Sequence, residues 1–331
     1  MAMNRFACAT LVLVACSCSR GGLQAIERAV AADAGDTRLD ASDTRPASDT
    51  FPTSEARPAD ASDTRPAVSC PSSLPQSGDS EQTLMMGTTS RSYWLHIPTS
   101  YDGTQPVPLL FDFHANGGNG FSQSKSSPYP DKTDPDGVVM AFPSGLIGPW
   151  GAAWNLGPCC VADVDDVAFT MAMIEQIQRS VCIDKQRIYA VGNITGGGMA
   201  YTLACRAADT FAAVAASAWD LLKENAADCK PSRPITVVSF RGTADQLVPY
   251  AGAYSTVVPG MPITFLGALK TFQKWAEIDQ CAGSPSDVNG CSRYSSCQGG
   301  VEVVLCTKQG GGSDVSDPSI AWPLLKKYSL P

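Results

Sequence analysis

Histidine is almost absent from this chain. Only His96 and His114 occur among its 331 residues, and none follows position 114. A zinc site would need closely spaced Cys-x-x-Cys pairs or neighbouring histidines, and the sequence has neither. We therefore expect no metal site and no cofactor. Any general base after position 114 would have to be something other than an imidazole.

Basic charge is also scarce. Lysine and arginine total 24 against 32 aspartates and glutamates, which gives a formal net charge of −8. Because no basic stripe is present to neutralise phosphates, nucleic acid is excluded as a partner. With 44% hydrophobic residues, the chain can form one full-sized folded domain.

The N-terminal residues indicate export. Arg5 precedes an apolar run over residues 6–15 that is too short to span a bilayer and is typical of a signal peptide. The run ends in Leu-Val-Ala-Cys at positions 13–16, similar to the signal of bacterial lipoproteins. We expect a signal peptide over residues 1–15 and an acylated Cys16 that binds membrane lipid of the bacterial cell envelope. An ordinary signal peptide cut nearby, followed by secretion, is the alternative.

Residues 16–69 have the composition of a tether. Ala, Asp, Ser, Thr, Pro and Arg dominate, and the octapeptide at 40–47 is repeated identically at 60–67. Such a segment buries too little apolar surface to fold, and its prolines favour an extended chain. We expect a disordered tether ahead of a folded domain over residues 70–331. A recognition or glycosylated segment is the alternative.

Cysteine usage agrees with export. Setting aside the three cysteines before position 19 leaves ten of the 13. An even number in an exported domain favours disulfides over metal ligands or catalytic thiols. Spacing does not determine the connectivity. We predict the pairs Cys205–Cys229 and Cys281–Cys297 and leave the others open.

After Cys70 the hydrophobic pattern alternates between two kinds of segment. Residues 107–114 and 137–143 are continuous apolar runs, as expected of strands buried on both faces, whereas residues 163–177 have helical spacing. The alternation predicts a mainly parallel sheet with helices on both faces. The expected strands are 92–98 (at an edge), 107–114, 137–143, 187–191, 211–216, 235–241 and 301–307; the expected helices are 163–177, 196–208, 266–278 and 319–328.

Three aspartates, Asp163, Asp165 and Asp166, stand where the first of these helices begins. Carboxylates at a helix N-terminus accept hydrogen bonds from free amides and oppose the helix dipole. We interpret them as capping residues, with calcium binding as the alternative.

Residues 187–201 have the layout of a strand, a sharp glycine-bounded turn and a helix of small residues. This layout is typical of a nucleophile elbow, whose pattern is Gly-x-Ser-x-Gly. Gly192 and Gly196 occupy the glycine positions, but the residue between them is Ile194, which has no nucleophilic atom. Thr195 has Asn193 two positions before it, so its hydroxyl is not expected to replace the nucleophile.

Six blocks in order resemble the secreted α/β-hydrolases of the polyhydroxybutyrate-depolymerase and feruloyl-esterase type, from about residue 83 to the C-terminus. The resemblance implies a disulfide-stapled α/β-hydrolase fold and a family of serine carboxylic-ester hydrolases. The blocks are residues 91–98, the oxyanion-type loop at 109–118, Trp-Asn-Leu-Gly-Pro-Cys-Cys at 154–160 with 165–169, the elbow with Cys205, the acid-type loop at 240–250, and 297–312 with three consecutive glycines.

The resemblance implies a Ser–Asp–His triad of which only the acid is present. Asp245 matches the acid, Ile194 stands at the nucleophile position, and Ser313 stands at the histidine position. A second register, which aligns the Trp-Pro at 322–323 with a family His-x-Trp-Pro motif, places Ile320 there instead. Since a serine hydroxyl needs an imidazole to remove its proton, either register leaves the chain without nucleophile and base.

The resemblance also implies an oxyanion hole and a pocket. The backbone amides of Ala115 and Thr195 would be the oxyanion donors. We expect His114 to make a structural hydrogen bond and His96 to have no chemical role. Trp154 and Trp219 lie on segments that lead to the pocket mouth, where they would either stack on a sugar or aromatic acid or pack in the core or rim.

The sequence therefore predicts an exported, lipid-anchored α/β-hydrolase-fold protein that has lost catalysis and binds a polysaccharide or ester polymer through the inherited cleft. Two alternatives stay open. One is an active carboxylic-ester hydrolase with a non-standard catalytic constellation, against which the missing serine and histidine argue. The other is a structural envelope protein, which the sequence does not separate from the first.

The anchor yields a first prediction. Replacement of Cys16 by serine removes the thiol that would be acylated, so the protein should move from the membrane fraction to the soluble fraction. Fractionation followed by immunoblotting measures this, with Cys18→Ser as the matched control that should stay with membranes. Unchanged membrane association of the Cys16→Ser variant would contradict the anchor.

Overall fold

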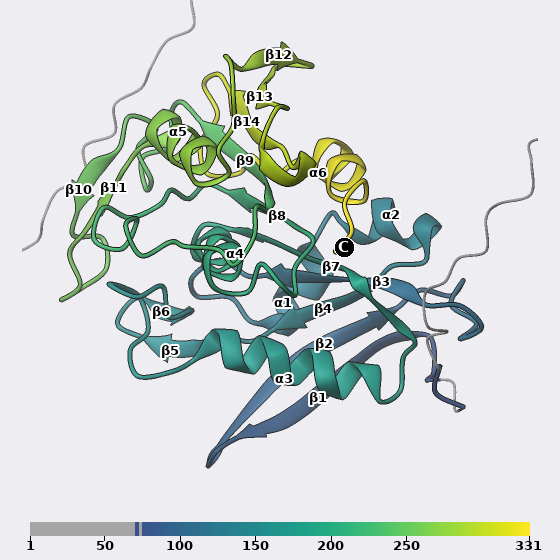
Figure 1. The fold of residues 1–331 in the computed structure, drawn as a ribbon. Coiled ribbons are helices and arrows are strands. Elements are labelled where there is room, and N and C mark those ends of the chain that lie inside the picture. The colour runs from purple at the N-terminus through teal and green to yellow at the C-terminus, as the bar shows by residue number, and fades with distance from the viewer. Residues whose placement is uncertain (1–69, 73–74) are drawn as a thin grey trace, which may run out of the picture. The chain divides into compact units, whose positions relative to one another are not determined.

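The structure is a computed structural model that describes residues 70–72 and 75–331 (Figure 1). The predicted signal peptide, the Cys16 anchor and the tether lie outside the described residues. Within the described part of the chain, no helix combines the length and the hydropathy needed to cross a membrane.

A ten-stranded mixed sheet runs through residues 75–331. Six central strands in the order β4-β3-β7-β8-β9-β14 pair in parallel, and antiparallel strands flank them on both sides. This confirms the predicted mainly parallel sheet. The strands are β1 (Gly78–Met86), β2 (Thr89–Ile97), β4 (Val139–Pro143), β3 (Val107–Phe113), β7 (Ile183–Asn193), β8 (Ala213–Ser217), β9 (Thr236–Gly242), β14 (Val303–Lys308), β13 (Cys291–Tyr294) and β12 (Ser286–Val288).

Helices cover both faces of the sheet (Figure 1). On one face Phe169, Leu203 and Trp275, from α3, α4 and α5, belong to the larger apolar cluster. On the other face Tyr129 and Trp322 belong to the second cluster, and Trp322 comes from α6. The helices are α1 (Gly120–Ser126), α2 (Pro130–Thr133), α3 (Asp166–Gln178), α4 (Thr195–Arg206), α5 (Ala268–Ile278) and α6 (Pro318–Leu325).

The expected edge strand is not at the edge. β2 lies between β1 and β4, so β1 forms the edge of the sheet. β1 carries the sequence Gly-Asp-Ser-Glu-Gln-Thr-Leu-Met-Met and is largely exposed, and it therefore lacks the apolar run by which buried strands are recognised. Two short hairpins were also not predicted, because strands of three residues are too short to show a hydrophobic pattern. They are β5 (Leu146–Gly148) with β6 (Gly151–Ala153), and β10 (Ala253–Ser255) with β11 (Ile263–Phe265).

Asp165 and Asp166, at the start of α3, make different contacts. The side chain of Asp165 accepts a hydrogen bond from the Ala168 amide, as predicted for an N-cap. Asp166 is buried and pairs with Arg91 at 2.8 Å, while its other oxygen accepts from the Asn155 amide at 2.7 Å. Because removing one partner of a buried ion pair leaves an uncompensated charge, this pair ties β2, α3 and the loop that contains Asn155 together.

All ten cysteines from position 70 onward are paired. The two predicted pairs, Cys205–Cys229 and Cys281–Cys297, are both present. Cys291 and Cys306 lie opposite each other in β13 and β14 and are joined across the two strands. The remaining disulfides are Cys70–Cys182 and the adjacent pair Cys159–Cys160.

The pairing predicts that none of these ten thiols reacts in the native protein. Alkylation of the unreduced, denatured protein followed by peptide mass mapping should therefore label none of the ten cysteines. A variant in which Cys70 and Cys182 are both serine should lose about 2–5 kcal/mol of unfolding free energy, because that bridge closes the longest loop. Labelling of six or more of the ten would contradict the disulfide framework.

Candidate functional site

The backbone at residues 192–196 forms a sharp turn, and the residue at its apex, Ile194, has no nucleophilic atom. Ile194 has φ 52° and ψ −120°, a conformation that a β-branched residue adopts only under strain, at a cost of roughly 1–3 kcal/mol. Its amide donates to the Ser217 carbonyl at 2.9 Å, and its carbonyl accepts from the Gly198 amide at 3.0 Å. The side chain is partly buried and packs against both apolar clusters.

The two elbow glycines are required by close backbone contacts. A Cβ at Gly196 would lie 1.9 Å from the Phe113 carbonyl oxygen, and one at Gly192 would lie 2.3 Å from the Gly196 oxygen. Any side chain there would push α4 away from β3 and β7. The glycines therefore keep the turn sharp although the residue at its apex carries no hydroxyl.

Asp245 is the residue that the resemblance places as the triad acid. Asp245 follows β9 and is 6% exposed, and its Oδ1 accepts from the amides of Leu247 and Val248 at 2.9 and 3.0 Å. Its Oδ2 is buried and has no hydrogen-bond partner within residues 75–331. An imidazole N–H would occupy such an oxygen in a working triad.

A buried arginine fixes the loop that carries this acid. Arg241, at the end of β9, forms an ion pair with Asp220, and neither side chain is exposed. The same guanidinium donates to the Val248 carbonyl at 2.6 Å. Since the Val248 amide holds Asp245, the arginine positions the carboxylate through the loop backbone. Sequence analysis missed this pair, because nothing in the spacing links positions 220 and 241.

Ser313 lies on a loop that contacts the acid loop. The Ala244 amide donates to the Gly311 carbonyl at 2.9 Å, and the Gly310 amide donates to the Thr243 hydroxyl at 2.8 Å. Ile320, the choice in the second register, instead lies within α6 and packs against the second apolar cluster. The structure thus brings the loop of Ser313, rather than Ile320, beside the loop of Asp245.

The expected oxyanion donors are available. Neither the Ala115 amide nor the Thr195 amide donates a hydrogen bond within the described part of the chain. The turn that contains Ala115 lies against the first turn of α4, since a Cβ at Gly196 would also approach the His114 carbonyl to 2.8 Å. The Thr195 hydroxyl is fully buried and has no partner among the described residues, so it is not accessible as a substitute nucleophile.

Both histidine rings are engaged in contacts with neighbouring groups. His114 is 1% exposed; its Nδ1 donates to the Ala115 carbonyl at 2.7 Å and its Nε2 accepts from the Gly145 amide at 2.9 Å. Burial lowers the pKa of His114 below the usual range, which keeps the ring neutral. His96 lies at the surface between the carboxylates of Asp79 and Asp134, at 2.6 and 3.1 Å. Neither ring faces Asp245 as a base.

The two tryptophans expected at the pocket differ in position. Trp154 is completely buried, with its ring edge-on to Phe113 at 5.0 Å and its Nε1 donating to the His114 carbonyl at 3.0 Å. It is a core residue that supports the oxyanion-type loop. Trp219 is 2% exposed and contributes its edge to a cavity on the flank of α4.

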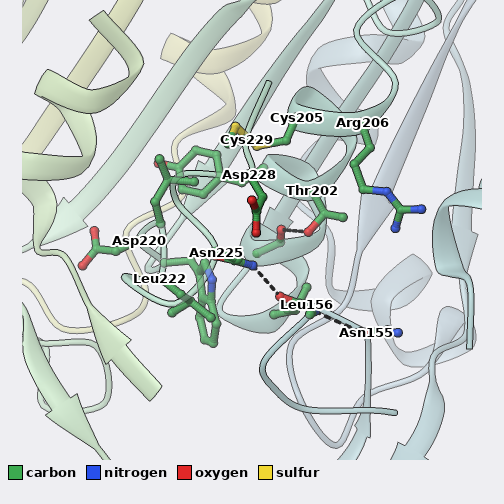
Figure 2. Close-up of a pocket in the computed structure, with 15 residues that line it drawn as sticks. Asn155, Leu156, Thr202, Cys205, Arg206, Asp220, Leu222, Asn225, Asp228 and Cys229 are labelled. Carbon is green, nitrogen blue, oxygen red and sulfur yellow. Dashed lines mark hydrogen bonds between the residues drawn. A yellow bond between two sulfur atoms is a disulfide. The ribbon is translucent and has the colours of Figure 1, made fainter. Parts of the chain in front are cut away.

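This cavity, which we call the α4 pocket, has a volume of about 230 Å³ (Figure 2). Neither Ile194, Asp245 nor Ser313 lines it. Residues 155–157 of the Trp-Asn-Leu-Gly-Pro-Cys-Cys block, Gly198 and Tyr201 of the elbow segment, Trp219 and the cysteines of one disulfide line it, but of these only Trp219 was predicted from sequence to lie at a pocket. The side chains used below are Leu156, Thr202, Trp219, Leu222, Asn225 and Asp228.

The chain is similar in sequence to proteins named as esterases. Feruloyl esterase B of Piromyces equi is 42% identical over 246 residues, which are 73% of this chain and 46% of that protein. A probable feruloyl esterase C of Aspergillus oryzae is 28% identical over 222 residues, 64% of this chain and 77% of that protein. The chain thus spans about half the length of the Piromyces relative. No protein-family model matches the chain.

Solved structures show the same fold. Acetyl xylan esterase from Aspergillus awamori superimposes with a TM-score of 0.56 at 12% identity, over 75% of this chain and 99% of that chain. A thermostable esterase superimposes with a TM-score of 0.51 at 15% identity, over 76% and 63% of the two chains. At such identities the likeness establishes the α/β-hydrolase fold alone. The sequence relatives, on this fold, support an esterase of the feruloyl-esterase type as the family of this chain.

Proposed function

We propose that this protein is an exported, lipid-anchored member of the esterase family that no longer hydrolyses esters and binds a polysaccharide or ester polymer through the inherited cleft. The observation that carries the proposal is Ile194 at the apex of an otherwise intact elbow. Its side chain can neither attack a carbonyl nor donate a proton. The lipoprotein-like residues 13–16 support the anchor.

The state of the other catalytic positions supports the loss of hydrolysis. Asp245 has a buried oxygen without a partner, and no histidine follows position 114 to fill the place beside it. Without an imidazole, a carboxylate alone is too weak a base to activate a hydroxyl at neutral pH. Loss of a triad member typically removes several orders of magnitude of rate, and loss of a second adds little.

The retained parts of the site support binding. The Ala115 and Thr195 amides can still donate hydrogen bonds to an ester carbonyl oxygen, a contact that forms with the bound ester as well as in catalysis. Beneath that carbonyl the methyl groups of Ile194 would replace the hydroxyl. The relatives are named for feruloyl esters and one fold neighbour for acetyl xylan, and an ester-bearing polymer of this kind is the ligand that we propose.

The first test measures hydrolysis and binding in the same samples. Purified full-length protein should release no product above a protein blank from short acyl, feruloyl or hydroxybutyrate esters, because nucleophile and base are absent. It should nevertheless co-sediment with insoluble feruloylated or acetylated xylan, or with polyhydroxybutyrate granules. Robust turnover that is abolished by mutating a residue other than Ile194 and Ser313 would overturn the proposal. So would a protein that co-sediments with none of the polymers.

The second test rebuilds the triad. Ile194→Ser alone and Ser313→His alone should each recover almost nothing, since each lacks the other partner. The double variant should exceed both singles on the order of ten-fold or more in ester turnover, a non-additive gain expected of groups that act together.

Two controls make this result specific. The pair Ile194→Ala with Ser313→His matches the double variant but has no hydroxyl, and it should stay inactive. Adding Asp245→Asn to the double variant should remove the recovered activity, because the imidazole would lose its orienting carboxylate. Equal activity in the double variant and its alanine counterpart would show that residues 194 and 313 do not stand at the two catalytic positions.

A further inference from the structure

We propose that the α4 pocket is a binding site for one ring of a neutral sugar. It lies beside α4 and is lined by residues of α4 from Gly198 onward, by the loop 155–157 and by segments that follow β8 (Figure 2). The inference does not depend on the proposed function, because none of the catalytic positions lines the pocket. It would hold for an active or an inactive member of the family.

Gly198 allows Leu156 and Trp219 to pack directly against α4 at the pocket wall. A Cβ at this position would lie 2.5 Å from Leu156 Cδ1 and 2.7 Å from Trp219 Nε1. Leu156, Leu222 and the Cys205–Cys229 disulfide supply apolar surface around the opening. The volume of about 230 Å³ is below the roughly 300–1,000 Å³ typical of drug-sized ligands, so a single ring is the size of group that fits.

Hydrogen-bond donors and hydrogen-bond acceptors both line the pocket beside this apolar surface. The indole N–H of Trp219 is a donor, and it has no acceptor within residues 75–331 although the residue is 2% exposed. Asn225 uses its Nδ2 to donate to the Leu156 carbonyl at 2.9 Å, which leaves its Oδ1 as an acceptor. Thr202 donates to the Gly198 carbonyl at 2.9 Å and keeps its lone pairs.

The Asp228 carboxylate is a further hydrogen-bond acceptor in the pocket lining. Asp228 is exposed at the rim, and its side chain turns toward Thr202 and Asn225 in Figure 2. It forms no ion pair among the described residues. Carboxylates accept strong hydrogen bonds from hydroxyl groups, and such charge-assisted bonds are about twice as strong as neutral ones. Acceptors therefore outnumber donors in the pocket, which suits a ligand rich in hydroxyl groups.

Other ligand classes fit this lining less well. Arg206 and Asp220 also line the pocket, but each is paired, Arg206 with Asp165 at 3.6 Å and Asp220 with Arg241, so the uncompensated charge at the pocket is the negative one of Asp228 (Figure 2). That charge repels phosphates and carboxylates. A purely apolar ligand would leave the Trp219 N–H without an acceptor, which costs free energy in a buried setting. A sugar hydroxyl can accept from the indole and donate to the carboxylate at once.

The experiment is a saturation-transfer NMR titration of the full-length protein with D-glucose, D-galactose, D-xylose and L-arabinose. At least one sugar should bind, with a dissociation constant in the millimolar range expected for a single ring. Thr202→Trp, which fills the opening, should abolish binding. Asp228→Asn should weaken binding about five-fold, since a neutral amide replaces the charged acceptor.

Matched controls separate the site from the rest of the surface. Asp209→Asn changes an exposed carboxylate outside the pocket and should bind as wild type does. Asp228→Asn is isosteric and decides the question if Thr202→Trp does not fold. Binding by none of the four sugars, or equal binding by wild type and Asp228→Asn, would overturn the proposal. Binding of ferulate in the pocket without any sugar would overturn the ligand class.

Discussion

The close contact between the first turn of α4 and the end of β3 determines the geometry of the whole site. Gly196 permits it, because any Cβ there would overlap the Phe113 carbonyl. The contact bends the chain sharply after β7, places Ile194 in its strained conformation and sets the Thr195 amide beside the turn that carries Ala115. The conformation of the apex and the positions of the expected oxyanion donors therefore follow from one packing constraint, which does not depend on the side chain at the apex.

Further contacts that hold this part of the fold are also independent of the side chain at position 194. Two buried ion pairs hold the surrounding loops: Arg91 with Asp166 near the oxyanion-type loop, and Arg241 with Asp220 near Asp245. Breaking either pair would leave a buried charge without compensation, so the fold maintains the loops for reasons of stability. Neither pair includes position 194 or position 313, so the residues at those two positions can vary without breaking these supports.

Much of the fold could be predicted from the residues. Strands such as β3 and β9 are continuous apolar runs because they are buried on both faces, and such runs stand out in a sequence. β1 was missed because it is mostly exposed and polar, which also led to the wrong placement of β2 at the edge. Two disulfides were predicted between cysteines close in sequence, whereas Cys70–Cys182 joins residues that only the folded chain brings together.

The sequence by itself determined that the chain has no nucleophile at the elbow and no histidine after position 114, because composition and position suffice for both. Only the tertiary structure decided which groups meet. It placed the loop of Ser313 against that of Asp245, engaged both nitrogens of His114 in backbone hydrogen bonds, and opened a pocket between Gly198, Leu156 and Trp219. These contacts join residues far apart along the chain. They form when separate elements pack together, and no local sequence pattern encodes that packing.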